Sequence, residues 1–153
     1  MFEISPASRQ DEEWVRDSYL QMWLDNNVLE SELLENWKEE YNRFIFYAKK
    51  KLHYIAIVAK SDGELLGAAH CQIFDGLFPR ITKTSLSNRG YIWGVFVRGE
   101  SRSQGIGEAL TRGCLRHLKA VHCSEVVLHT SPYGEELYKK LGFKHSTELI
   151  LEM

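Results

Sequence analysis

The sequence predicts a mixed α/β fold, and three observations predict it. The stretch from Tyr91 to Val97 is almost entirely β-branched and aromatic, which is typical of a strand buried on both faces. A helix with an apolar stripe and an outward basic face follows it from Ile106 to about Val121. Two further strands, 53–60 and 65–74, are joined by Ser61-Asp62-Gly63-Glu64, a sequence that favours a hairpin turn. The stripe of the helix is Ile106, Leu110, Cys114, Leu118 and Val121, and its outward face is Arg112, Arg116 and Lys119.

The N-terminal third predicts a short strand and two helices. Residues 2–5 alternate apolar and polar side chains before Pro6, which indicates an edge strand. Ser8 and the acids after it predict the start of the first helix, and a second helix is expected from about Ser31. The expected apolar faces are Trp14, Val15, Tyr19, Met22 and Trp23 for the first helix, and Leu34, Trp37, Tyr41, Phe44, Ile45 and Ala48 for the second.

The remaining segments complete the pattern of strands and helices. Residues 75–90 carry proline, glycine and small polar side chains, so they predict a long loop. After the central helix, the sequence predicts a buried strand at 125–130, a turn at 131–134, a short helix at 135–141 closed by Gly142, and a terminal alternating strand at 145–153.

Composition fits one domain, 1–153, of a cytoplasmic globular protein. The 153 residues are 44% hydrophobic and 26% charged, and no apolar run is long enough to span a bilayer. A net charge of −2 opposes a nucleic-acid partner. The odd cysteines, Cys71, Cys114 and Cys123, lack metal-ligand spacing and are expected to be reduced thiols.

Gly105 and Gly107 stand at the entry to the central helix. Because they have no Cβ, backbone N–H groups there can approach a bulky ligand closely. The first turn of a helix has unpaired N–H donors and the positive end of the helix dipole, so this entry predicts a phosphate site. The other interpretation is a tight strand–helix turn with no ligand. A dinucleotide site is disfavoured because Leu110 stands where the third glycine would be needed.

With these motifs, the chain resembles the GNAT superfamily of acetyl-coenzyme A-dependent N-acetyltransferases. The superfamily motif R/Q-x-x-G-x-G/A is matched by Arg102, Gly105 and Gly107. A second motif, Y-x-x-x-G-F, is matched by Tyr138, Gly142 and Phe143. The order of elements agrees from Ile4 to Met153. The resemblance implies a mixed, mostly antiparallel twisted sheet with helices on both faces.

The resemblance also implies how acetyl-coenzyme A is bound. The pyrophosphate would lie on the loop and first helical turn made by Arg102, Ser103, Gln104, Gly105, Ile106, Gly107 and Glu108. The pantetheine arm would follow the backbone of Val95, Phe96 and Val97, where the fourth and fifth strands of the superfamily separate. No metal is implied.

Tyr138 is implied as the acid that protonates the departing thiolate, although a buried tyrosine can also serve packing alone. The predicted strand 91–97 has no Asp, Glu or His, so the general base stays unassigned. The options are water relayed through strand backbone and His129 or Ser131, or an acceptor amine of low pKa. His70, His129 and Cys71 are expected to be structural more often than catalytic.

The predicted reaction is direct transfer of acetyl to a primary amine in a ternary complex. The resemblance implies that residues 23–34 and 75–90 shape the site of the acceptor, a small molecule or a peptide. Acids near residue 30 suit a cationic acceptor, but a helix dipole explains them equally well. The alternative is an inactive coenzyme A-binding or protein-interaction module. A homodimer is common in the superfamily, and nothing in the sequence decides it.

Overall fold

A five-stranded sheet in the order β1-β2-β3-β4-β5 forms the centre of the computed structural model, which describes residues 1–76 and 88–153. Its strands are β1 (Glu3–Pro6), β2 (Ile55–Ser61), β3 (Glu64–Ile73), β4 (Arg89–Val97) and β5 (Glu125–Val127). The first four strands pair antiparallel, and β5 pairs parallel with β4. The predicted mixed, mostly antiparallel sheet is therefore confirmed.

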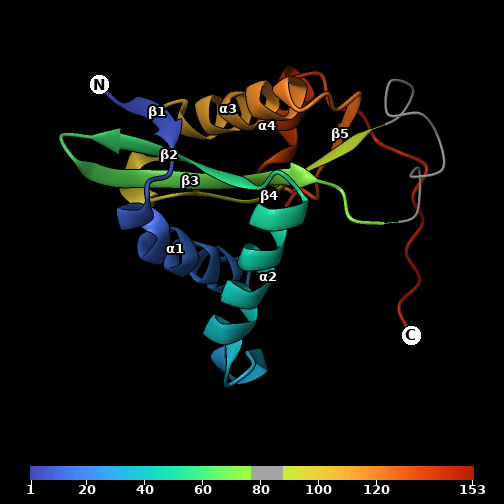
Figure 1. Ribbon diagram of the computed structural model, residues 1–153, viewed down its shortest axis with the longest axis horizontal. Helices are drawn as coiled ribbons and strands as arrows, with labels where there is room; N and C mark the ends of the chain where they lie inside the picture. The colour runs from blue at the N-terminus through green and yellow to red at the C-terminus, as the bar shows by residue number, and fades with distance from the viewer. Residues whose placement is uncertain (77–87) are drawn as a thin grey trace.

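Helices cover both faces of this sheet (Figure 1). One face carries α1 (Glu12–Asp25) and α2 (Trp37–Lys51), and the other carries α3 (Ile106–Ala120) and the short α4 (Glu135–Lys140). Three 3₁₀ turns, Arg9–Asp11, Glu30–Glu32 and Gly99–Ser101, precede α1, α2 and α3. The result is a three-layer arrangement in which α1 and α3 lie on opposite sides of β4.

Each face of the sheet has its own apolar core, because side chains alternate along the strands. Ile57 and Ala59 of β2 face α3, whereas Ala56 and Val58 face α1 and α2. The stripe predicted for the central helix is confirmed up to Leu118, since Ile106, Leu110, Cys114 and Leu118 are fully buried. Val121, its last predicted member, caps the helix and is half-buried.

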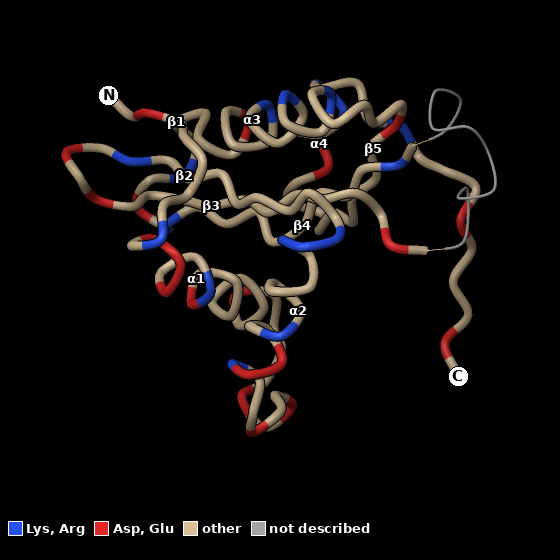
Figure 2. Tube along the Cα trace, in the orientation of Figure 1, with Lys and Arg blue, Asp and Glu red and all other residues tan. Residues whose placement is uncertain are grey.

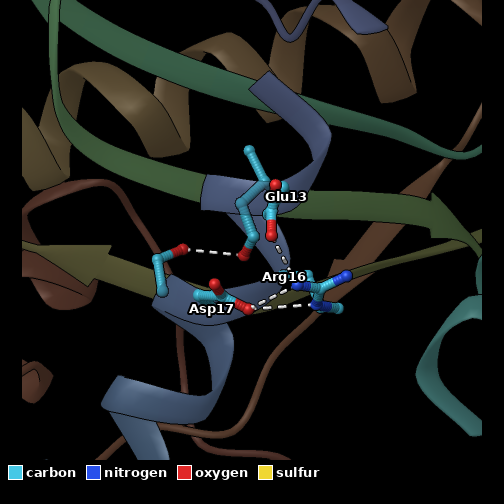
Figure 3. Close-up of polar contacts among 5 residues, drawn as sticks. Glu13, Arg16 and Asp17 are labelled. Atoms are coloured by element: carbon cyan, nitrogen blue, oxygen red, sulfur yellow. Dashed lines mark hydrogen bonds and ion pairs between the residues drawn. The ribbon is translucent and has the colours of Figure 1, made fainter. Parts of the chain in front are cut away.

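Arg16 of α1 is held by two acids of its own helix and also contacts α2. Arg16 of α1 pairs with Glu13 at 3.4 Å and with Asp17 at 2.9 Å (Figure 3). The Arg16 guanidinium also lies 6.0 Å from the ring centre of Trp37 in α2. Only the C-terminal end of α2, at Ala48, is buried, and its N-terminal half extends away from the sheet (Figure 1).

A β-bulge interrupts β4 at Gly94. His70 pairs with Trp93 and Ala68 pairs with Phe96, so Gly94 and Val95 together lie opposite one residue of β3. Gly94 has φ +59°, a conformation that glycine adopts without steric penalty. The extra residue reverses the alternation of side chains after it, so that Val95 joins Ile92 in the core on the α3 side.

A second register shift lies next to Gly67, where Ala59 pairs with Gly67 and Lys60 pairs with Leu65. A Cβ on Gly67 would lie 2.7 Å from the Phe96 carbonyl oxygen, so glycine allows β3 and β4 to approach. The hairpin turn is also confirmed, with positive φ at both Asp62 and Gly63.

Several predicted elements need correction. Residues 145–153 form no strand: Leu149, Ile150 and Leu151 are at least 82% exposed, and the chain runs away from the sheet (Figure 1). The strand predicted at 125–130 ends at Val127, because its pairing with β4 stops there. The second helix begins at Trp37, since Ser31 belongs to a separate 3₁₀ turn.

Two further expectations concern β4 and the segment before it. Residues of β4 alternate between buried and half-buried, so the strand is not fully buried on both faces. Most of the loop predicted at 75–90 lies outside the described residues. Within residues 1–76 and 88–153, no helix is long and apolar enough to cross a membrane, and no group of three or more His, Cys, Asp or Glu could hold a metal ion.

Candidate active site

The cleft of this protein begins where β4 and β5 separate. The two strands pair only from Arg89 to Tyr91 and from Glu125 to Val127. Beyond that point the edge of β4 has no partner strand among the described residues, and a cleft of about 1650 Å³ opens beside it. Val95, Phe96 and Val97, the predicted pantetheine contacts, all line this cleft.

The N-terminus of α3 faces the same cleft. Gly105 caps the helix with φ +80°, and a Cβ placed on it would meet no atom within 4 Å. The backbone N–H groups of residues 105–108 have no acceptor in the described part of the chain. Four unpaired donors at the positive end of a helix dipole form a site for an anion, with open space in front of it.

The loop residues before α3 differ in their positions. Ser103 lines the cleft in the left-handed region, with φ +63°. Gln104 does not line it, and its side chain donates to the Glu100 carbonyl at 3.3 Å. Glu108 lines the cleft and pairs with Arg112 at 2.8 Å, one turn further along α3.

Arg102, which sequence reasoning assigned to the phosphate, is held by two groups of the protein. Its Nε donates to the Val97 carbonyl at 3.1 Å, and its Nη2 donates to Asp25 Oδ2 at 2.7 Å. The hydrogen bond from Gln21 and the pair with Arg102 hold the pKa of Asp25 below its usual range. Arg102 therefore joins the C-terminus of α1 to the edge of β4.

Tyr138 of α4 also lines the cleft and is 9% exposed. Its ring packs edge to face against Phe143, with 5.8 Å between ring centres. Its hydroxyl has no hydrogen-bond partner among the described residues, and burial raises the pKa of Tyr138 to about 12. Leu137 of α4 and Leu141, which caps the helix, are only half-buried.

The residues considered for proton removal lie at the mouth of the cleft. His129 follows β5, is exposed, and has its ring 6.0 Å from that of Tyr91. Ser131 lines the cleft nearby and is half-buried. No carboxylate of β4 accompanies them, as the sequence indicated.

The structure adds a buried histidine that sequence reasoning treated as ordinary. His70 of β3 is fully buried beneath Gly94, and a Cβ on Gly94 would lie 2.7 Å from its Cδ2. Its Nδ1 is 2.8 Å from the Tyr54 hydroxyl, whereas its Nε2 has no partner in the described structure. Burial lowers the pKa of His70 to about 3, so the ring is neutral at pH 7. No local pattern reveals this contact, because it depends on the bulge.

The half of the cleft between α1, α2 and β4 is aromatic. Tyr19, Tyr41 and Phe44 surround Trp93, with ring centres 5.0, 6.5 and 6.0 Å from it. Trp93 is itself stacked on His70 at 4.0 Å. The sequence predicted Tyr19, Tyr41 and Phe44 on the apolar faces of helices and Trp93 in a buried strand.

A helix N-terminus with free N–H groups, an open strand edge and a buried tyrosine in one cleft define an acyl-coenzyme A-binding fold. The sequence profile described as the acetyltransferase (GNAT) family matches residues 12–143. The chain therefore belongs to this family, whose acyl donor is acetyl-coenzyme A, and the predicted class of acetyl-coenzyme A-dependent acetyltransferase is confirmed at the level of the family.

Known proteins agree with this assignment. An N-alpha-acetyltransferase of Sulfurisphaera tokodaii is 32% identical over 112 residues, which are 69% of this chain and 66% of that protein. A GCN5-related N-acetyltransferase from Ralstonia eutropha JMP134 has a TM-score of 0.82 at 20% identity, covering 100% of this chain and 99% of the other. A predicted acetyltransferase from Clostridium acetobutylicum, solved with acetyl-CoA, has a TM-score of 0.83 at 20% identity, covering 100% and 96%. These two structures support the fold.

Proposed function

We propose that this protein, acting as a single domain, transfers an acetyl group from acetyl-coenzyme A to a primary amine. The observation that carries the proposal is the cleft itself. The cleft contains the four unpaired N–H groups of residues 105–108, the open edge of β4 and the Tyr138 hydroxyl.

The residues present fit acetyl-coenzyme A. The N–H groups of residues 105–108 would hold the pyrophosphate, and the absence of any atom near Gly105 leaves room for it. The edge of β4 from Val95 to Val97 would hydrogen-bond the amide-containing arm. Because the Val97 carbonyl already accepts from Arg102, this edge offers fewer acceptors than its length suggests. When bound, acetyl-coenzyme A supplies the acetyl group as an activated thioester.

Tyr138 has the properties of a general acid for this transfer. A pKa raised to about 12 keeps the phenol protonated at neutral pH, so it has a proton to donate to the sulfur as the C–S bond breaks. The nitrogen of the acceptor forms the new C–N bond and loses a proton to water. His129 and Ser131 both line the cleft, and either would orient such a water.

The class of acceptor receives partial support from the relative named N-alpha-acetyltransferase, which favours the α-amine of a polypeptide. A reducing compartment such as the cytoplasm suits the chain, because Cys71, Cys114 and Cys123 are free thiols. The alternative, an inactive module that only binds coenzyme A, predicts thermal stabilisation by the ligand without thiol release in the presence of any amine.

Substitution of Gly105 tests the donor site. Gly105 and Gly63 both have positive φ and open space where a Cβ would lie, but only Gly105 lies in the cleft. Gly105→Val and Gly63→Val should therefore lose similar stability, and only Gly105→Val should lose the coenzyme A-dependent rise in Tm. In the wild type this rise corresponds to about 2.7 kcal/mol at a ligand concentration of 100 Kd. Gly105→Ala serves if the valine variant does not fold. An unchanged ligand response in a folded Gly105 variant would show that the anion site is elsewhere.

A further inference from the structure

We propose that the acceptor is a primary amine attached to an aromatic or large apolar group, which binds among the rings between α1, α2 and β4. The proposal rests on the proposed function, and it names the chemistry of the second substrate. Free arylalkylamines and peptides that begin with a large apolar residue share this chemistry.

The rings of this half of the cleft are fixed before any ligand binds. Trp93 is held from behind by stacking on His70, and its Nε1 donates to Gln72 Oε1 at 3.1 Å. Tyr19 packs edge to face on Trp93, and Tyr41 is tilted against Tyr19 with 5.7 Å between ring centres. A preformed aromatic wall binds a flat or bulky apolar group without the loss of side-chain freedom that a flexible wall would require.

Apolar surface in this half is left uncovered. Trp23, Leu34 and Phe44 all line the cleft, and they are 42%, 62% and 39% exposed. Exposed large apolar side chains that converge on a concave surface mark a ligand site rather than ordinary surface. Removing this surface from water favours an acceptor with an apolar body.

The charges around these rings suit a cation. Glu32 and Glu40 line this half, and Glu40 also pairs with the exposed Arg43 at 3.0 Å. Asp25 lines the cleft too, but it is paired with Arg102 at 2.7 Å. The other basic residue lining the cleft in the described chain, Lys140, belongs to α4. Acidic positions gather around the protruding end of α2 (Figure 2). An ammonium group is attracted both by these carboxylates and by the faces of the aromatic rings. A carboxylate next to the amine would be repelled.

The aromatic rings and the acidic side chains of this half favour different parts of the acceptor. The rings favour the apolar body, and the acids favour the charged amine before it loses its proton. Polar amines such as ethanolamine have the charged amine without the apolar body, and an amino-terminal aspartate adds a carboxylate that the acids would repel. The structure therefore assigns selectivity to this wall rather than to the donor site.

Two pairs of matched variants on α2 compare side chains that line the cleft with side chains of the same type that do not. Phe44 lines the cleft, while Phe46, two residues later, is 62% exposed and lies outside it. Likewise Glu40 lines the cleft and Glu39 does not. All four side chains are exposed or half-buried, so the variants Phe44→Ala, Phe46→Ala, Glu40→Gln and Glu39→Gln should fold.

The test measures amine binding and turnover separately. Tryptophan fluorescence of the coenzyme A-saturated protein, titrated with 2-phenylethylamine or ethanolamine, reports binding in the cleft, which Trp23, Trp37 and Trp93 line. Thiol release from acetyl-coenzyme A then gives kcat/KM for both amines and for the peptides Phe-Gly-Gly and Asp-Gly-Gly. We expect the aromatic members to bind and react at least about tenfold better than the polar members. Phe44→Ala should remove most of that preference, and Glu40→Gln should weaken the aromatic amine roughly threefold at low salt. Phe46→Ala and Glu39→Gln should behave as the wild type.

The outcomes distinguish the possible failures. Preference for Phe-Gly-Gly over 2-phenylethylamine identifies a peptide source, and the reverse identifies a free amine. Acetylation without preference for the aromatic members overturns this inference and leaves the proposed function standing. Selective binding of the aromatic amine without turnover supports the site and overturns the proposed function. Dimerisation that Phe44→Ala abolishes, with amine selectivity unchanged, would show that a second copy covers this face and would also overturn the inference.

Discussion

The bulge at Gly94 gives the sharpest test of how this cleft is built. Gly94→Ala places a methyl group 2.7 Å from Cδ2 of His70 and 3.0 Å from Cδ2 of Tyr19, both in rings that are packed on several sides. Forcing an L-residue into the left-handed region costs about 1–2 kcal/mol. Overpacking among rings that cannot move costs a further 1–3 kcal/mol or so. The free energy of unfolding should therefore fall by about 2–5 kcal/mol.

The control is Gly63→Ala in the hairpin turn. Gly63 has φ +83°, and a Cβ placed there would have nothing within 4 Å, so only the backbone cost applies. Urea unfolding should show a loss of about 1–2 kcal/mol for Gly63→Ala, with an unchanged m-value. In a protein of this size, the larger loss at Gly94 corresponds to a fall in Tm of very roughly 4–20 °C.

A double-mutant cycle assigns the additional loss to the correct contact. In a His70→Ala background the nearest atom is gone, so Gly94→Ala should cost less there than in the wild type, while the contact with Tyr19 keeps part of the penalty. Equal losses for Gly94→Ala and Gly63→Ala, or a cycle with no coupling, would refute the reasoning that the bulge is held against the His70 ring.

Three further changes test the site. Tyr138→Phe keeps the ring, so folding and coenzyme A binding should survive while turnover falls about 10²–10⁴-fold; wild-type turnover would make Tyr138 a packing residue. Because the pKa of His70 is about 3 in the folded protein and near 6.5 when unfolded, stability should fall as pH drops from about 6.5 toward 3, by about 1.4 kcal/mol per pH unit. His70→Gln should remove that slope in urea titrations and His129→Gln should not. Asp25→Asn breaks the 2.7 Å pair with Arg102, so coenzyme A should bind roughly threefold tighter at low salt; calorimetry showing no gain would mean that Arg102 is not free to reach the ligand.

The parts of the fold that sequence could predict are those with strong local signals. The stripe from Ile106 to Leu118 recurs at helical period, and every predicted member of it up to Leu118 is buried. Gly63 and Gly142 were predicted from turn and cap chemistry, and both have positive φ. Such features depend on neighbouring residues only, so the chain itself contains the information.

The errors arose where a partner element decides the structure. Residues 145–153 alternate like a strand, but alternation says which side chains share a face and not whether an edge is available to pair with. β5, only three residues long, already ends its pairing at Val127. The C-terminal segment therefore has the residue pattern of a strand but no neighbouring strand with which it forms hydrogen bonds.

The candidate site was predicted in part for the same reason. The glycine-containing loop and the tyrosine were found from motifs, and the structure brings them into one cleft. The face of Val95 could not be predicted, because the bulge at Gly94 shifts the alternation by one residue. The aromatic wall around Trp93 could not be predicted, because its rings come from α1, α2 and β4, which are far apart in the sequence.

The slightly negative net charge of the protein is consistent with a phosphate-bearing donor, because backbone N–H groups rather than side-chain charges would attract the phosphate. A net charge of −2 gives no general pull on an anion, and Arg102 beside α3 is paired with Asp25. Glu108 in the first turn of α3 is likewise paired, with Arg112. What is left unpaired there is the set of backbone N–H groups at residues 105–108, which act over short range and have fixed directions. In the proposed binding mode the backbone N–H groups select the donor, so the acidic side chains in the other half of the cleft could select the amine. One cleft can therefore bind an anionic donor and a cationic acceptor, because backbone N–H groups would bind the first and acidic side chains would attract the second.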